Sequence, residues 1–282
     1  MDSTGISFTA LFTGQVWYES GISNRFFTSP KGRLLYKTLR PFDRLADSII
    51  GITLHDMLIQ RHQIMDHRID GLIKTQGVSQ ILEIACGYSP RGYTLSRKYP
   101  DLKYVEADLP HMAERKRALL QANHGFGPDH QVVGCDVFEF GAPYGLDYVM
   151  EEVLDPDRPT ILVTEGLVNY FHLDDISQVW QRLAQLGRVY PKAWYITDLV
   201  YNFGKHLIPG AVAAGSKMLS LATRANVNLH FNNRDEIQRG FLECGFTDVQ
   251  IHRPEDFVNH LPIPMGKSKS VVRVVESQIH AP

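Results

Sequence analysis

The chain has 282 residues, 44% hydrophobic and 21% charged, which is the composition of a globular protein with a sizeable core. Its formal net charge of −2 offers no positive excess for binding nucleic acid or an anionic membrane surface. Three scattered cysteines do not suggest a disulfide framework. The chain shows neither a signal-peptide pattern nor an apolar run of about 18 residues, which a membrane span would need. We therefore expect a cytoplasmic protein without a membrane partner.

The N-terminal quarter of the chain precedes any predicted strand and has helical patterning. Apolar residues recur at helical spacing between Ile49 and Ile73. We therefore expect residues 1–78 to form a helical extension, packed on a domain formed by residues 79–282.

From residue 80 onwards predicted strands and helices alternate, as a doubly wound sheet requires. The expected strands lie near 80–85, 103–107, 130–133, 160–164, 193–198, 247–252 and 270–275. The expected helices lie near 90–99, 110–124, 174–188 and 233–243. No full helix separates the last two strands, which indicates an antiparallel pair at the sheet edge. The predicted fold class is α/β, with a Rossmann-like, mostly parallel sheet of seven strands.

The first strand ends in a turn that is typical of nucleoside-binding sheets. Its apolar run breaks at Gly87, where the missing side chain lets the backbone pass close to a ligand. The second strand carries Glu106, 19 positions after Gly87. An acid at the end of this strand can accept hydrogen bonds from both hydroxyls of a ribose. This segment therefore predicts a nucleoside-containing cofactor.

The residues of the turn favour one such cofactor over another. A dinucleotide fingerprint would have glycine at three positions that are here Ala85, Gly87 and Pro90. Pro90 also removes a backbone N–H that a pyrophosphate group would need. S-adenosylmethionine has no phosphate, so one glycine of close approach and the acids Glu83 and Glu106 suffice. We therefore predict S-adenosylmethionine as the cofactor.

Further candidate residues follow the third and fourth strands. Asp136 is placed to accept a hydrogen bond from the adenine amino group, although an aspartate that caps its own loop is a credible alternative. Glu165 follows an apolar strand and should point into the crevice, either as a ligand of the cofactor's amino group or as a catalytic base. Tyr170 and His172 come next in the chain and could contact the methyl acceptor.

Residues 199–230 form a long connection between the fifth strand and the next helix. Their length, aromatic content and position at the end of a central strand predict a lid over the crevice, with a loose surface excursion as the alternative. The segment contains His206, which, like His172, could act as the general base for a phenol, whose pKa is about 10. A carboxylate acceptor is already ionised and needs only orientation.

The histidines near the N-terminus do not suggest a metal site. His55, His62 and His67 are separated by 7 and 5 residues, and these spacings do not place three ligands on one helical face. We predict that the protein holds no metal.

Four blocks of the sequence, in the right order, resemble a known family. They are residues 61–66 before the first strand, 83–91 at the glycine turn, 105–110 with the following Lys116, and 164–170, which contains Glu-Gly-x-x-x-Tyr. The chain resembles the class I S-adenosylmethionine-dependent methyltransferases over about residues 9–250. Within that class it is similar to the leucine carboxyl methyltransferase-like group, which includes polyketide O-methyltransferases. The resemblance implies that Arg61 holds the carboxylate of the cofactor and that residues 164–170 border its methyl group.

These observations predict an S-adenosylmethionine-dependent O-methyltransferase. It would methylate a carboxylate or a phenolic hydroxyl of a small molecule by in-line displacement. The alternatives are an NAD(P)-dependent oxidoreductase on the same sheet and a catalytically silent module that binds S-adenosylmethionine. The sequence leaves the identity of the acceptor and the oligomeric state open.

Overall fold

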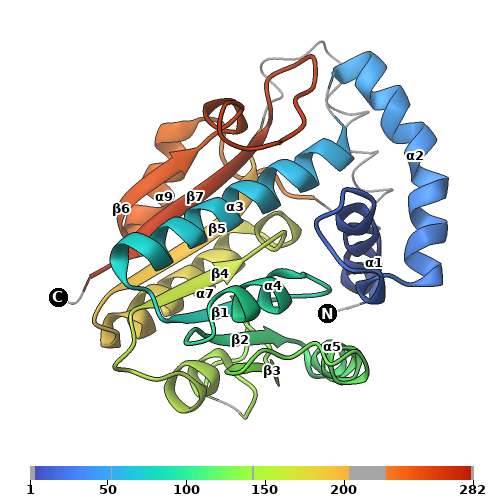
Figure 1. Cartoon of the computed structure of the whole chain (residues 1–282). Helices are drawn as coiled ribbons and strands as arrows, with labels where there is room; N and C mark the ends of the chain where they lie inside the picture. Colours follow the sequence, from blue (N-terminus) through green and yellow to red (C-terminus); the bar gives the residue numbers. More distant parts are fainter. Residues whose placement is uncertain (1–3, 52, 142, 203–226, 281–282) are drawn as a thin grey trace.

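A computed structural model describes residues 4–51, 53–141, 143–202 and 227–280 (Figure 1). Its centre is one seven-stranded sheet with the strand order β3-β2-β1-β4-β5-β7-β6. The strands are β1 (Gln80–Ile84), β2 (Lys103–Asp108), β3 (His130–Gly134), β4 (Thr160–Thr164), β5 (Ala193–Val200), β6 (Thr247–His252) and β7 (Val272–Ile279). Strands β1 to β5 are parallel, and β7 is antiparallel to both β5 and β6. The predicted fold class is confirmed.

The helices that alternate with these strands lie close to their predicted positions. They are α4 (Arg91–Lys98), α5 (Pro110–Ala122), α7 (Leu173–Leu186) and α9 (Arg234–Glu243). The largest difference in a boundary is at β7, which ends four residues later than expected. The short turns were not predicted, because none is long enough to show a hydrophobic period. They are η1 (Arg25–Phe27), α6 (Leu146–Tyr148), η2 (Val149–Val153), η3 (Val168–Tyr170), η4 (Gly187–Val189) and η5 (Pro254–Asp256).

Three long helices precede the sheet: α1 (Thr4–Glu19), α2 (Pro30–Ile50) and α3 (Leu54–Gln76). The start of α3 is capped by Thr53, whose hydroxyl accepts a hydrogen bond from the backbone N–H of Asp56 at 2.9 Å. Its end is capped by Gly77 in the left-handed conformation. Helix α3 lies along the sheet, and α1 and α2 stand beyond its edge (Figure 1). The predicted boundary at residue 78 between an extension and a domain stays a prediction.

The central strands β1, β4 and β5 are buried on both faces, as expected for a sheet covered by helices on two sides. Leu82 of β1 belongs to an apolar cluster with α7 and α9, in which Trp180 is completely buried. Its neighbour Ile81 belongs to a second cluster, with Ile64 of α3. Successive residues of a strand point to opposite faces, so these two clusters are the two faces of the sheet.

The carboxyl ends of the parallel strands meet at one edge of the sheet, where the chain turns sharply. After β1, both Ala85 and Gly87 have positive φ angles, of +55° and +48°. After β4, Gly166 has a φ of +68°. A side chain at Gly166 would start only 2.7 Å from a guanidinium nitrogen of Arg61, so this turn requires glycine. The turns bring α3 and the strand ends together around one crevice.

Candidate functional site

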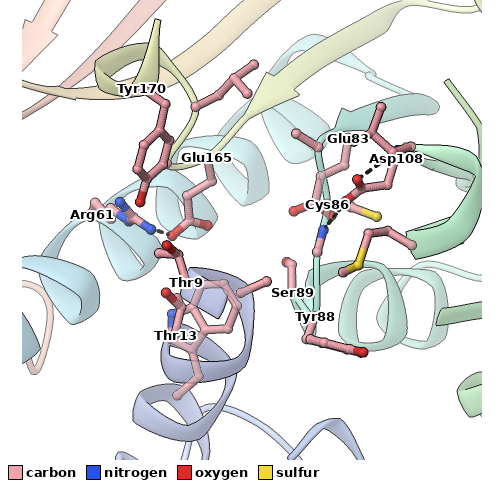
Figure 2. A pocket seen from close by; sticks show the side chains of 18 residues that line it. Thr9, Thr13, Arg61, Glu83, Cys86, Tyr88, Ser89, Asp108, Glu165 and Tyr170 are labelled. Atoms are coloured by element: carbon pink, nitrogen blue, oxygen red, sulfur yellow. Dashed lines mark hydrogen bonds and ion pairs between the residues drawn. The ribbon is translucent and has the colours of Figure 1, made fainter. Parts of the chain in front are cut away.

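A cavity occupies the edge at which β1, β2 and β4 end (Figure 2). Its walls come from α1, α3, the turn after β1, the start of α5 and the turn after β4. The ionisable groups that line it are Arg61, Glu83, Asp108 and Glu165, together with tyrosines and Cys86. Burial raises the pKa of the Cys86 thiol well above its usual value, so this group is neutral. Three carboxylates against one guanidinium give the cavity an excess of negative charge.

Arg91, the first residue of α4, is completely buried behind this cavity and joins three carboxylates. Its guanidinium nitrogens donate to Asp66 at 2.5 Å, to Glu83 at 2.6 Å and to Glu165 at 2.7 Å. Tyr104 donates its hydroxyl proton to the other oxygen of Glu83 at 2.7 Å. These contacts fix the positions of the Glu83 and Glu165 carboxylates at the wall of the cavity.

Arg61 joins the turn after β4 to the end of β5. Its Nε donates to Glu165 at 3.1 Å and one terminal nitrogen donates to Asp198 at 3.3 Å. Burial alone would raise the pKa of Glu165, but His62, Arg91 and Arg61 together hold it far below its usual value. Glu165 is therefore a carboxylate throughout the physiological pH range, which makes it a poor general base.

Asp108 is the acidic residue that β2 presents to the cavity. Its Oδ2 accepts a hydrogen bond from the backbone N–H of Gly87 at 2.7 Å, and its Oδ1 accepts one from the N–H of Leu109 at 2.8 Å. Burial raises the pKa of Asp108, against the lowering effect of these two donors. Each oxygen can accept a further hydrogen bond, so the carboxylate can bind two hydroxyl groups as hydrogen-bond donors.

Glu106, which we predicted as the ribose ligand, does not line the cavity. It is completely buried between Lys116, whose Nζ lies 2.6 Å away, and His130, whose Nε2 lies 3.1 Å away. A side chain at Gly92 would start 2.5 Å from a Glu106 oxygen, so α4 covers this acid. Residues 106 and 108 point to the same face of β2, and only the later one reaches the strand end. The spacing rule admits both acids, and position at the strand end would have selected Asp108.

The remaining predicted residues differ in whether they line the cavity. Asp136 does not line the cavity; its carboxylate accepts a hydrogen bond from the backbone N–H of Phe138 at 3.1 Å, which is the loop-capping alternative. Tyr170 lines the cavity, and burial raises the pKa of its hydroxyl. His172 is exposed at the start of α7 and does not line the cavity. His206 lies outside the described residues, as does most of the predicted lid.

A second cavity adjoins the first and shares part of its wall. The shared residues are Thr9, Thr13, Arg61, Gly166 and Tyr170. Beyond them the wall is mostly apolar and comes from α1, α3, β5 and β7, with Asp198 as its added carboxylate. Asp198 was not among the predicted residues, although an acid inside the apolar run of β5 was a signal that could have found it.

Asn169 forms hydrogen bonds to the chain on both sides of residues 203–226. Its Nδ2 donates to the carbonyl of Val200 at 2.9 Å and to that of Asn228 at 2.7 Å. Its Oδ1 accepts a hydrogen bond from the N–H of Val200 at 2.8 Å. The end of β5 and the returning chain are therefore held together at the wall of the second cavity.

The described residues limit the kinds of site that they can form. They contain no group of three or more His, Cys, Asp or Glu that could hold a metal ion. None of the helices they form is both long and apolar enough to cross a membrane.

Known proteins resemble this chain in sequence and in fold. The family model described as leucine carboxyl methyltransferase matches residues 27–184. "Leucine carboxyl methyltransferase 1" of Eremothecium gossypii is 25% identical over 113 residues, and the match spans 33% of this chain and 34% of that protein. A DUF574 family protein of Streptomyces avermitilis has a similar fold, with a TM-score of 0.66, 15% identity and 97% of each chain covered. A protein of Thermobifida fusca YX, solved as a candidate methyltransferase, has a TM-score of 0.61, 16% identity and 90% of each chain covered.

Proposed function

Because this chain belongs to the leucine carboxyl methyltransferase family, whose members use S-adenosylmethionine, we propose that it is an O-methyltransferase acting on a carboxylate or hydroxyl of a small apolar molecule. The observation that carries this proposal is the pair of adjoining cavities, one rich in carboxylates and one largely apolar. They correspond to the two substrates of a methyl transfer, a cationic donor and an acceptor.

The charged groups of the first cavity fit S-adenosylmethionine. This cofactor carries a sulfonium, an ammonium and a carboxylate, so its net charge is positive. Three carboxylates and one arginine line the cavity, which complements that charge. A dinucleotide would instead bring a doubly negative pyrophosphate, and the cavity offers it one guanidinium already paired with Glu165 and Asp198. The same residues therefore disfavour the oxidoreductase alternative.

Two residues would hold the ends of the cofactor. Asp108 would accept the ribose hydroxyls at the end of β2, in place of Glu106. Arg61 would hold the carboxylate of the methionine moiety through its second terminal nitrogen, which makes no hydrogen bond to the described residues. The amino group would lie among the carboxylates, where Glu165 offers a fixed negative charge.

In this proposal the bound cofactor supplies an electrophilic methyl group. The protein holds the donor and the acceptor in position and excludes water from the site. Tyr170 lies on the wall that the two cavities share, so it would contact the acceptor close to the methyl group. The apolar wall of the second cavity would exclude water that could compete as a nucleophile.

Titration calorimetry on the wild-type protein tests the cofactor part of this proposal. S-adenosylhomocysteine is expected to bind at one site, and NADH is expected to produce no saturable heat at the same concentrations. Saturable binding of NADH without binding of S-adenosylhomocysteine would contradict the proposal and support the oxidoreductase.

A further inference from the structure

The second cavity holds one carboxylate in a wall that is otherwise mainly apolar. Phe12 of α1, Leu58 of α3, Val200 of β5 and Val272 of β7 contribute apolar surface. Asp198 is 3% exposed and lies two residues before the end of β5. A buried carboxylate at a ligand cavity restricts what can bind beside it, because an unpaired polar partner is costly there.

Within the described parts of the chain, Asp198 has few hydrogen-bond partners for a buried carboxylate. Its Oδ1 accepts from the backbone N–H of Gly166 at 2.6 Å, and its Oδ2 accepts from Arg61 at the longer distance of 3.3 Å. A carboxylate has about four acceptor positions, so capacity remains on both oxygens. Asp198 can therefore accept another hydrogen bond from a ligand, and burial raises its pKa against the lowering effect of Arg61.

The charges around Arg61 also oppose a negatively charged acceptor. Within the connected network, Arg61 and Arg91 face Asp66, Glu83, Glu165 and Asp198. His62 adds positive charge only when it is protonated. Among the described residues, carboxylates thus outnumber guanidiniums before any ligand binds, and the positive charge of the proposed cofactor would balance them. An acceptor carboxylate would add a further buried negative charge, whereas a hydroxyl adds none.

On these grounds, and resting on the proposed methyltransferase function, we propose that the second cavity takes an uncharged apolar acceptor whose hydroxyl group donates a hydrogen bond to Asp198. During transfer the hydroxyl oxygen forms a bond to the methyl carbon while the bond between that carbon and sulfur breaks. The electron pair of the broken bond stays on sulfur, and the hydroxyl proton passes to Asp198 and then to solvent. A carboxylate acceptor has no proton to donate and would meet Asp198 as a like charge.

Two probes of the same shape test this proposal: 4-ethylphenol and 4-ethylbenzoate. Their dissociation constants are measured by ligand-observed NMR on protein saturated with S-adenosylhomocysteine at pH 7, where the phenol is neutral and the benzoate is ionised. The wild-type protein is expected to bind the phenol at least tenfold more tightly. Methyl transfer from labelled S-adenosylmethionine is expected to show the same preference.

The variant Asp198→Asn removes the negative charge and keeps an oxygen for the N–H of Gly166. It is expected to reduce the preference for the phenol at least tenfold. Asp235→Asn, an exposed substitution in the first turn of α9, is the matched control and is expected to keep the wild-type preference. If Asp198→Asn does not fold, the comparison of the two probes on the wild-type protein still decides the question.

Four results would overturn the proposal. The first is equal or tighter binding of the benzoate by the wild-type protein, and the second is an unchanged preference in folded Asp198→Asn. The third is binding of neither probe while S-adenosylhomocysteine binds, which would remove this cavity as the acceptor site and leave the cofactor assignment intact. The fourth is no binding of S-adenosylhomocysteine, which would contradict the proposed function itself and the acceptor proposal with it.

Discussion

The carboxylate of Asp108 accepts a hydrogen bond from the backbone N–H of Gly87, with 2.7 Å between Oδ2 and the nitrogen. This bond joins the end of β2 to the turn after β1, so the acid and the glycine of close approach form one unit. A Cβ atom added at Gly87 would lie 3.3 Å from the Cβ of Ala10 in α1, which shows how closely the N-terminal helix covers the turn. The cofactor site thus depends on contacts between three separate parts of the chain.

The first prediction concerns Asp108. Asp108→Asn is expected to weaken the binding of S-adenosylhomocysteine at least tenfold. The substitution removes the negative charge and replaces one oxygen, which would accept a hydrogen bond from a ribose hydroxyl, by an N–H donor. Calorimetric titration measures the dissociation constant. Asp101→Asn, an exposed substitution just before β2, is the control and is expected to bind normally. Normal binding by both variants would remove Asp108 from the site.

Glu106 is expected to matter for stability rather than for binding. Glu106→Gln leaves the buried ammonium of Lys116 without a counter-charge and is expected to lower the free energy of unfolding by about 3–5 kcal/mol, as is usual when one partner of a buried pair is removed. Urea denaturation measures this loss. The folded variant is expected to keep the wild-type affinity for S-adenosylhomocysteine, and a large loss of affinity would restore Glu106 as a ligand.

The same residue predicts a dependence of stability on pH. Burial would raise the pKa of Glu106, but Lys116 and His130 hold it below its usual value of 4.5 in the folded protein. A depressed pKa contributes stability that is complete above the unfolded pKa and is lost as the pH falls towards the folded one. The free energy of unfolding is therefore expected to fall more steeply below about pH 4.5 in the wild-type protein than in Glu106→Gln. Parallel curves for the two proteins would contradict this.

Two glycine substitutions are expected to act in opposite directions. Gly166→Ala forces a positive φ on alanine and is expected to lower the free energy of unfolding by about 1–2 kcal/mol. The added methyl group would also displace the guanidinium of Arg61, so S-adenosylhomocysteine is expected to bind more weakly. Gly71→Ala lies in α3 with nothing within 4 Å of the added carbon, and it is expected to stabilise the protein by about 0.5–1 kcal/mol. Thermal unfolding measures both changes, and wild-type stability with wild-type binding in Gly166→Ala would contradict the role given to this turn.

A last pair of variants compares two predicted catalytic residues. Tyr170→Phe is expected to lower the rate of methyl transfer to 4-ethylphenol and to leave the affinity for S-adenosylhomocysteine nearly unchanged, because Tyr170 lines both cavities. His172→Ala is expected to change neither quantity, since His172 is exposed at the start of α7. A selective loss of rate in His172→Ala would reverse this assignment.

The sheet could be predicted from the sequence because its signals are local. Apolar runs and glycine turns each depend on a few neighbouring residues, and all seven strands follow from them. Glu106 and Asp108 show the limit of this reasoning: both satisfy the spacing, and in the sequence only position at the strand end favours Asp108. The structure adds that Gly92 and Lys116 cover Glu106. The sequence shows Asp198 as an acid within an apolar run, but its place at the site depends on α3 bringing Arg61 to the end of β5, which is a tertiary relationship that no local pattern contains.

A crystal structure with S-adenosylhomocysteine bound tests the central claim, that two adjoining cavities hold the methyl donor and the acceptor. The account predicts that both ribose hydroxyls bind the carboxylate of Asp108 and that the sulfur faces the wall shared with the second cavity, beside Tyr170. A ribose held by another residue, or a sulfur that faces away from the cavity containing Asp198, would contradict it.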